Sequence, residues 1–393
     1  MDKRLLFLLL LPSLAHASFS GYSYQRIFTI NGPTAVSTQA ATLSNFPVLI
    51  STFIISMTTD SAQGHLQNAN GFDLVWSTKP DCSFLVNWDT ETISNVGVST
   101  MNVWVQVPQV SSNAYTNLYA CYGNSSITTY QGHSTATWDS NYAGVWHLPN
   151  GTTLTANDST ANGNTGTLSG GTPPTATTGE IDGAGNFYYT GGSYVNVGSG
   201  SSLALTSAWS VSAWINPSGF PNYPVVLARG DPSSGGHQNW YLQLWASTVE
   251  AGFSQGSTGV YLDVAPVSAG TTSYLAATWD GTYIRIYENG TLVGTSPNYS
   301  AYTPDTAGMH ADIGGMPWIP SDGNGFLGMI DEARVSSSIR SAAWIQTEYN
   351  NQFSPTTFYT VSPEESSQPA PGYSALTING GSVTINGGGV TIY

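Results

Sequence analysis

The sequence predicts an all-β fold made of two antiparallel β-sandwich domains. Short runs of alternating apolar and polar residues are separated by glycine, asparagine and aspartate turns, which is the pattern of antiparallel strands. Long helical periodicity is nearly absent, and only residues 341–352 look helical. Charged residues make up 8% of the chain and aromatic residues 12%. This composition suits an extracellular β-protein that hydroxyl and amide side chains keep soluble.

The clearest strands form a predicted three-stranded meander over residues 274–293. Its turns fall at Asp280-Gly281 and Asn289-Gly290, two dipeptides that favour tight hairpins. Further strands are predicted over residues 102–108, 117–123, 209–217, 224–230 and 239–246. Trp209, Trp214 and Trp279 occupy strand positions, so we expect them in the core.

Composition divides the chain into a signal peptide (1–17), a first sandwich (18–138), a second sandwich (141–360), a linker (361–375) and a repetitive tail (376–393). Lys3 and Arg4 precede an apolar run over residues 5–11, and Ala15 and Ala17 offer small residues for cleavage. That run is too short to span a bilayer. We therefore expect a protein that is secreted or held at the cell surface, without membrane insertion.

The tail repeats a seven-residue unit in which a short alternating strand is followed by an Asn-Gly-Gly turn. Such strands are too short to be stable as a lone hairpin, and they carry no charge or proline that would block edge pairing. Two interpretations remain open: a flexible end, or strands that add to a sheet edge of the same chain or of a neighbouring molecule. We favour edge pairing, and with it self-association.

The charge balance excludes two classes of partner. Without residues 1–17, six of the eight basic residues and 22 of the 23 acidic residues remain, because that segment holds Lys3, Arg4 and Asp2. A protein that binds nucleic acid or an anionic membrane needs clustered lysine and arginine, and this chain has no such cluster. Zinc is not expected, since the histidines are scattered without ligand spacing. Cys82 and Cys121 are expected to form a disulfide, because a single cysteine pair in an exported protein is usually bonded.

Several segments resemble known families. Within the first domain these are "GYSYQRIFTI" (21–30), "NFPVLI" (45–50), "NGFDLVWST" (70–78) and "LYACYGNSS" (118–126), which resemble the bacterial domain of unknown function 2341 family. Members of that family often precede a laminin-G-like, concanavalin A-like jelly roll. The second domain resembles that partner over residues 145–170, 193–217, 276–294 and 326–352. The resemblance implies a jelly roll, a fold that hosts lectins, adhesins, enzymes and spacers.

The sequence offers no convincing catalytic motif. Jelly rolls that resemble laminarinases place carboxylates on one strand as E-x-D-x-x-E or E-x-D-x-E, and this chain has neither. Glu180-Ile181-Asp182 is the nearest fragment, and it lies among glycines where a loop is expected. Residues 252–256, "GFSQG", match the nucleophile elbow by chance, because a strand follows instead of a helix. We therefore expect a protein that is not an enzyme.

The loop over residues 158–167 is a candidate calcium site. Asp158, Asn162 and Asn164 provide side-chain oxygens, and glycines between them let the backbone curl inward. In jelly rolls that resemble this one, the corresponding loop often helps to hold calcium, with a partner carboxylate from a late strand, here Asp331. The alternative is a plain turn stabilised by its own side chains. We favour the calcium site.

Two loops are candidates for carbohydrate contact. Trp318 lies in a loop rich in proline and glycine, with Asp322 and Asn324 nearby, and His237 and Trp240 form the second candidate. The alternative is that these tryptophans cap the core. The predicted function is non-catalytic recognition of a glycan or of a cell-surface or matrix protein, through carbohydrate binding or adhesion. Two alternatives to this function remain. The protein is a structural component whose domains act as spacers, or it is a glycan-active enzyme whose site the sequence does not reveal.

Overall fold

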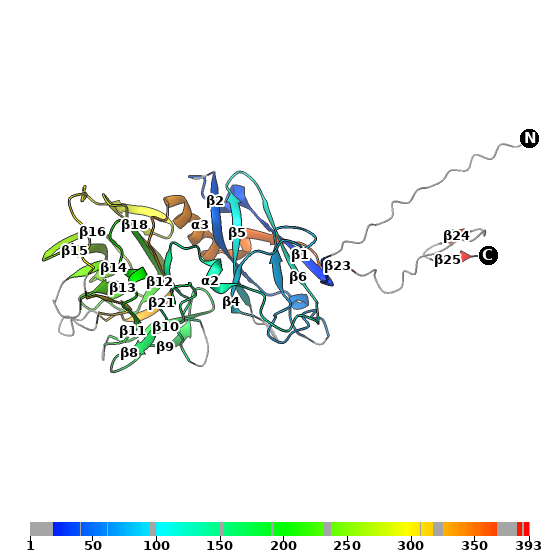
Figure 1. Ribbon diagram of the computed structural model, residues 1–393, viewed down its shortest axis with the longest axis horizontal. Coiled ribbons are helices and arrows are strands. Elements are labelled where there is room, and N and C mark those ends of the chain that lie inside the picture. Colours follow the sequence, from blue (N-terminus) through cyan, green and yellow to red (C-terminus); the bar gives the residue numbers. More distant parts are fainter. Residues whose placement is uncertain are drawn as a thin grey trace, which may run out of the picture.

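The computed structural model of the protein describes residues 19–367, except 40, 61, 94–99, 150–152, 190–191, 232–236, 307 and 317–324, and the backbone of 383–386 and 389–392. In these ranges nearly all regular structure is β-strand, and it forms two sandwiches side by side (Figure 1). The predicted fold class is confirmed. No helix within the described ranges is long and apolar enough to cross a bilayer. The predicted signal peptide lies outside them.

Two antiparallel sheets form the first sandwich. One has the strand order β22-β1-β6-β3, with β23 also paired to β1, and the other has the order β2-β5-β4. The strands are β1 (Tyr24–Ile30), β2 (Thr42–Thr52), β3 (Val75–Ser77), β4 (Trp88–Thr92), β5 (Met101–Ser111), β6 (Thr116–Tyr122), β22 (Tyr359–Val361) and β23 (Glu365–Ser366). Three short helical turns complete it: α1 (Gly32–Ala35), η1 (Ile55–Met57) and α2 (Ser134–Thr137).

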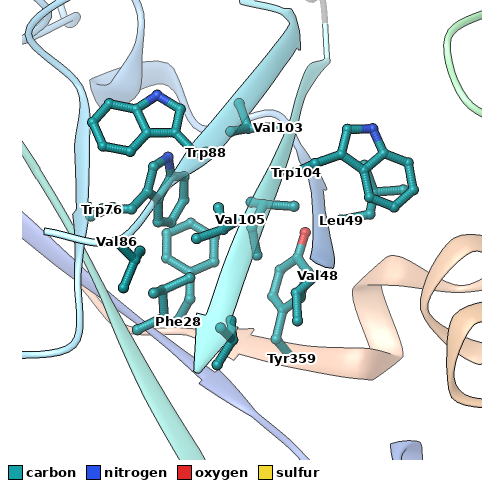
Figure 2. Packing of buried hydrophobic residues seen from close by; sticks show 14 of the residues in the cluster. Phe28, Val48, Leu49, Trp76, Val86, Trp88, Val103, Trp104, Val105 and Tyr359 are labelled. Atoms are coloured by element: carbon teal, nitrogen blue, oxygen red, sulfur yellow. The ribbon is translucent and has the colours of Figure 1, made fainter. Parts of the chain in front are cut away.

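Aromatic and β-branched side chains fill the first sandwich (Figure 2). Phe28 lies edge-on to Trp76, with ring centroids 5.1 Å apart, and 5.4 Å from Tyr359. The predicted disulfide is confirmed: Cys82, after β3, is bonded to Cys121 in β6, with a Cα–Cα distance of 6.4 Å. It fastens a loop to the sheet at a point 39 residues away along the chain.

The second sandwich packs an eight-stranded sheet on a seven-stranded sheet. Their orders are β19-β18-β17-β12-β21-β10-β9, with β7 paired to β21, and β16-β15-β14-β13-β20-β11-β8. The strands are β7 (Tyr142–Trp146), β8 (Thr167–Ser169), β9 (Thr175–Thr178), β10 (Gly183–Phe187), β11 (Tyr194–Gly198), β12 (Trp209–Pro217), β13 (Val225–Gly230), β14 (Gln238–Trp245), β15 (Thr248–Gln255), β16 (Thr258–Pro266), β17 (Ser273–Trp279), β18 (Ile284–Glu288), β19 (Thr291–Thr295), β20 (His310–Ile313) and β21 (Gly328–Ser336). The turn η2 (Ser201–Leu203) precedes β12.

Sequence periodicity located these strands well. The meander over residues 274–293 is confirmed as β17, β18 and β19, paired in that order. Trp209, Trp214 and Trp279 are buried, as expected for large side chains on core-facing strand positions. Residues 252–256 end β15 and turn into β16, so the elbow-like match lies in a hairpin.

The helix α3 (Ala342–Phe353), followed by α4 (Pro355–Phe358), lies between the two sandwiches (Figure 1). Asn351 of α3 both accepts from Leu49 N (2.7 Å) and donates to Leu49 O (3.1 Å), as a paired strand would. Trp344 packs on Phe46 with ring centroids 4.8 Å apart. On its other side, Ile345 packs in a separate cluster with Trp214 and Tyr274 of the second sandwich. The helix therefore joins the core of the first sandwich to the eight-stranded sheet of the second.

The predicted domain boundary at residue 360 is wrong. Strands β22 and β23 pair antiparallel with β1, so that Ile30 lies opposite Tyr359 and Gln25 opposite Glu365. The Pro- and Ser-rich composition of this segment suggested a linker, but backbone hydrogen bonds to an edge strand do not depend on side-chain type. The chain thus returns to the first sandwich after completing the second.

The described backbone of the tail forms β24 (Val383–Asn386) and β25 (Gly389–Ile392), which pair antiparallel with each other. Within the described ranges, neither strand joins another sheet of the chain. The expected edge pairing on a domain of the same chain is therefore not found there. Pairing with a neighbouring molecule, and self-association, stay predictions.

Candidate functional site

Hydrogen bonds within the loop and to strand β7 organise the predicted calcium loop. The Asp158 carboxylate accepts four of them, from Val145 N (3.1 Å), Thr160 N (2.9 Å), Thr160 Oγ1 (2.9 Å) and Asn164 N (2.7 Å). The Asn162 amide donates to Tyr142 O at 2.9 Å. These are the contacts of the alternative interpretation, a turn stabilised by its own side chains. Calcium binding here stays a prediction, which melting curves in calcium and in chelator would test.

Asp331 has a different partner from the one expected. Its Oδ2 accepts hydrogen bonds from Glu180 N (2.9 Å) and Ile181 N (3.0 Å), which lie in the turn between β9 and β10. The fragment Glu180-Ile181-Asp182 is therefore a loop, as its glycine neighbours predicted. Asp331 holds this turn against β21 and is fully buried.

The predicted carbohydrate contacts have separate outcomes. Trp318, Asp322 and Asn324 lie outside the described residues. The expectation for Trp240 is wrong: this side chain is 1% exposed, and its indole donates to Leu203 O at 2.9 Å. Trp240 faces the core between the two sheets. His237 is partly exposed, and its Nδ1 lies 2.9 Å from Asp305 Oδ2.

A pair of exposed aromatic side chains lies on the outer face of the seven-stranded sheet. Along β14, Trp240, Leu242 and Leu244 point into the core, so alternation turns Tyr241, Gln243 and Trp245 outward. Trp245 is 51% exposed and Tyr223 is 39% exposed. Their rings are nearly parallel, with centroids 6.4 Å apart and planes inclined by 16°. They form a broad apolar surface in contact with water.

A row of polar side chains crosses the same face beside this pair. Gln243, Glu250 and Asp263 lie opposite one another on β14, β15 and β16. Gln243 Nε2 donates to Glu250 Oε1 at 2.6 Å. Burial, followed by the charge of Asp263, raises the pKa of Glu250 to about 7. Near neutral pH this carboxyl group therefore exists in both protonation states, and it can donate as well as accept hydrogen bonds.

The local sequence explains how this face is shaped. Gly252 lies opposite Tyr241, and a Cβ at that position would meet the Tyr241 hydroxyl at 2.8 Å and Val260 O at 2.3 Å. Glycine therefore allows Tyr241 to lie across β15. At the end of β14, Ala246 adopts a positive φ of 50° in a tight turn, and its N–H donates to Asn222 O at 3.0 Å. This bond holds the Tyr223 segment beside Trp245.

A second group of polar side chains is buried where the two sandwiches meet. His147 follows β7, with its Nδ1 2.7 Å from Glu332 Oε1 on β21 and its Nε2 3.2 Å from Asp89 Oδ2 on β4. Glu91 Oε2, also on β4, lies 3.9 Å from His147 Nδ1. Arg334 Nη2 lies 2.6 Å from Glu332 Oε2. We call Asp89, Glu91, His147, Glu332 and Arg334 the junction cluster.

Indole rings and α3 enclose the junction cluster. The Arg334 guanidinium lies over the rings of Trp104 and Trp138, 4.3 and 4.9 Å from their centroids, and it also pairs with Glu348 of α3. Trp104 Nε1 donates to Glu91 Oε2 (3.3 Å), and Trp138 Nε1 donates to Asp89 Oδ2 (3.0 Å). The cluster therefore combines strand and loop residues from both sandwiches, and α3 covers it through Glu348.

Burial and charge act in opposite directions on the junction cluster. Burial alone would lower the pKa of His147, but the charge of Glu332 and the hydrogen bond to Asp89 hold it well above its ordinary value. Burial would raise the pKa of Asp89, whereas its hydrogen bond and charge interaction with His147 lower it to about 2. For Glu91, burial and then the charge of Glu332 raise the pKa well above the ordinary value.

Sequence reasoning missed the junction cluster. Its members come from three segments, near residues 90, 147 and 332, which no local spacing connects. One signal was available: strand β21, "GMIDEARVS", places Asp331, Glu332 and Arg334 within an otherwise apolar strand. Charges on a buried strand must be paired to be tolerated, so this pattern points to a partner cluster.

Comparison with known proteins identifies part of the second sandwich. A sequence model of the concanavalin A-like lectin/glucanases superfamily matches residues 189–346, less than half of the chain. This match supports the jelly-roll resemblance of the second domain. The resemblance of residues 18–138 to the domain of unknown function 2341 family stays an expectation. No curated protein matches the sequence.

Similar solved structures have low sequence identity. Domain 4 of AbnA, a GH43 extracellular arabinanase from Geobacillus stearothermophilus, in complex with arabinotriose, is 19% identical; the match covers 52% of this chain and 97% of that chain, with a TM-score of 0.42. The Ruminococcus gnavus IT-sialidase CBM40, bound to alpha2,3 sialyllactose, is 17% identical; that match covers 35% of this chain and 80% of that chain, with a TM-score of 0.32. Similarities of this size carry no argument about the activity or ligand of this chain.

Proposed function

We propose that this is a secreted, non-catalytic glycan-binding protein, and that its sugar site is the outer face of the seven-stranded sheet. The site comprises Tyr223 and Trp245 with Asp263, which is the exposed member of a row in which Gln243 and Glu250 are buried. The main support for this proposal is the Tyr223–Trp245 pair, whose rings are exposed and nearly parallel and lie beside that row. Ring faces pack against the C–H surface of a sugar, while a few fixed polar groups orient its hydroxyls. The superfamily match of this domain supports the same proposal.

The exposure of Trp245 is not explained by packing. A buried aromatic side chain removes about 150–250 Å² from water, which is why Trp240 on the same strand lies inside. Trp245 faces outward next to a second exposed ring, and adjacent exposed apolar surface is more typical of a binding site than scattered single residues. Tyr261 on β16, which is 45% exposed, extends the aromatic border of this face.

The ligand we propose is a neutral or cationic sugar. The formal net charge of the whole chain is −15, and Asp263 adds an exposed carboxylate to the site itself. This field repels polyanionic glycans, so heparin-like chains should bind weakly or not at all.

A glycan array probed with the full chain tests the proposal. Trp245→Ala should lose binding to the neutral sugars that the wild-type protein retains, without a change in melting temperature. Phe84→Ala is the control, since Phe84 is an exposed aromatic residue of the first sandwich and should leave binding intact. Equal binding by wild type and Trp245→Ala would contradict the proposed site.

The alternative function is a structural spacer, which one observation favours. Helix α3 and strand β22 lock the two sandwiches together, and such a rigid unit suits an assembly component. A well-folded protein that binds no glycan on the array would support this alternative over the proposed function.

A further inference from the structure

We propose that Glu91, His147 and Glu332 form a binding site for one divalent transition-metal ion between the two sandwiches. Their ligand atoms lie within 4.8 Å of one another. His147 Nδ1 is 2.7 Å from Glu332 Oε1 and 3.9 Å from Glu91 Oε2. Two ligand atoms on a tetrahedral zinc ion, each about 2.1 Å from the metal, lie about 3.4 Å apart. The observed separations bracket that value.

The second observation is an oxygen without a partner. Glu91 Oε1 accepts no hydrogen bond from the described residues, and the Glu91 side chain is 0% exposed. A buried carboxylate oxygen without a donor costs free energy, and it costs more next to another carboxylate. A cation bound by Glu91, His147 and Glu332 would offset the repulsion between the two carboxylates and give the Glu91 carboxylate a positive partner.

The surrounding residues hold the three ligands as a metal site requires. A histidine that binds a metal usually donates its other ring N–H to a carboxylate, which fixes the tautomer. His147 Nε2 faces Asp89 Oδ2 at 3.2 Å in this way, leaving Nδ1 directed at Glu332 and Glu91. The Trp104 indole fixes Glu91 through the oxygen that faces His147.

The donor set selects the class of metal. Calcium takes six to eight oxygen ligands, whereas an imidazole with two carboxylates suits zinc or manganese. The ion would take the place of the His147–Glu332 hydrogen bond, with His147 Nδ1 as the imidazole ligand.

An ion-pair network alone accounts for most of the junction cluster but not for Glu91. His147 satisfies Asp89 and Glu332, and Arg334 satisfies Glu332 and Glu348. Arg334 Nη1 and Nη2 are directed to Glu348 and Glu332, so neither reaches Glu91. The unpartnered Oε1 of Glu91 is the feature that the ion-pair network leaves unexplained.

The test uses the full chain, first treated with chelator and then titrated with Zn²⁺, Mn²⁺ or Ca²⁺. We expect Zn²⁺ and Mn²⁺ to bind at one ion per chain and to raise the melting temperature, and Ca²⁺ to do neither. Glu91→Gln keeps the side-chain volume and removes the charge. It should melt like the wild type in chelator and lose the response to metal.

Glu364→Gln is the matched control, because Glu364 pairs with His65 at 2.9 Å without a third carboxylate. This variant should keep the full response to Zn²⁺. The proposal fails if Zn²⁺ and Mn²⁺ leave the wild-type melting curve unchanged, or if Glu91→Gln responds as strongly as the wild type. Neither result depends on glycan binding, so this test is independent of the proposed function.

Discussion

The outer face of the seven-stranded sheet and the junction cluster both place carboxylates on β-strands, yet the two regions treat them differently. At the outer face, Glu250 has an amide and another carboxylate as neighbours, and burial raises its pKa to about 7. At the junction, Asp89 lies against His147, which lowers the pKa of Asp89 to about 2. Within the junction, Glu91 lies farther from His147, at 3.9 Å, and burial and the charge of Glu332 raise its pKa. Direct contact with a cation thus decides the direction in which the pKa of a buried acid moves.

Cations are scarce in this chain, so their positions are informative. Only six basic residues follow the predicted signal peptide, and Arg229, Arg334 and Arg340 among them are buried. Arg340 pairs with Asp139, while Arg334 completes the junction cluster. Two of the three buried arginines, Arg334 and Arg340, therefore lie at the contact between the two sandwiches.

The largest expected effect comes from removing a cation at the junction. Arg334→Met removes the arginine that pairs with Glu348 and leaves Glu332 with His147 alone, and breaking a buried pair in this way costs about 3–5 kcal/mol of unfolding free energy. Urea denaturation measures the loss. Arg285→Met is the control: Arg285 pairs with Asp280 in a partly exposed position, where a pair contributes about 0–1 kcal/mol. A larger loss for Arg285→Met would invert the comparison.

A pH-dependent effect is expected at the outer face. The pKa of Glu250 is about 7 in the folded protein, and it is about 4.3 in an unfolded chain. Between these values the folded state holds more protons than the unfolded state, so stability falls as pH rises through this window. Glu250→Gln should remove this part of the pH dependence, as followed by melting temperature across the pH series.

The variant Asp263→Asn tests the same pH dependence of the melting temperature from the side of the neighbouring carboxylate. It removes the neighbouring charge that helps to raise the pKa of Glu250, and it should therefore move the upper end of the window to lower pH. An unchanged pH profile in both variants would show that Glu250 does not titrate in this range.

The smallest effect on stability is expected for Trp245→Ala. This outward-facing side chain should change the unfolding free energy by less than about 0.5 kcal/mol, as surface substitutions do. Trp240→Ala on the same strand should cost about 3–5 kcal/mol, because it empties a core position. Similar losses in the two variants would mean that Trp245 is part of the core.

These two tryptophans also show what the sequence could and could not predict. The alternation of apolar and polar residues located strand β14 correctly. However, aromatic side chains occur on both faces of this strand, so the sequence did not reveal which face is turned to the core. Trp240 and Trp245 are an odd number of residues apart, so they lie on opposite faces. We expected ligand contact at the one that is buried.

The junction cluster was beyond sequence reasoning for a different reason. Glu91, His147 and Glu332 meet only because the second sandwich docks on the first, and the hydrophobic pattern of each strand does not encode docking. Zinc was not expected because only local histidine spacing was considered. The disulfide was predictable, since Cys82 and Cys121 are the only two cysteines in the chain.

The return of β22 and β23 to β1 makes the second sandwich an insertion within the first. The first sheet obtains an edge strand, and its core obtains Phe358 and Tyr359, only after some 200 further residues have been synthesised. Domains often fold in order as they emerge. Here that order is reversed: the inserted sandwich can close first, and the amino-terminal one must wait for the segment behind it.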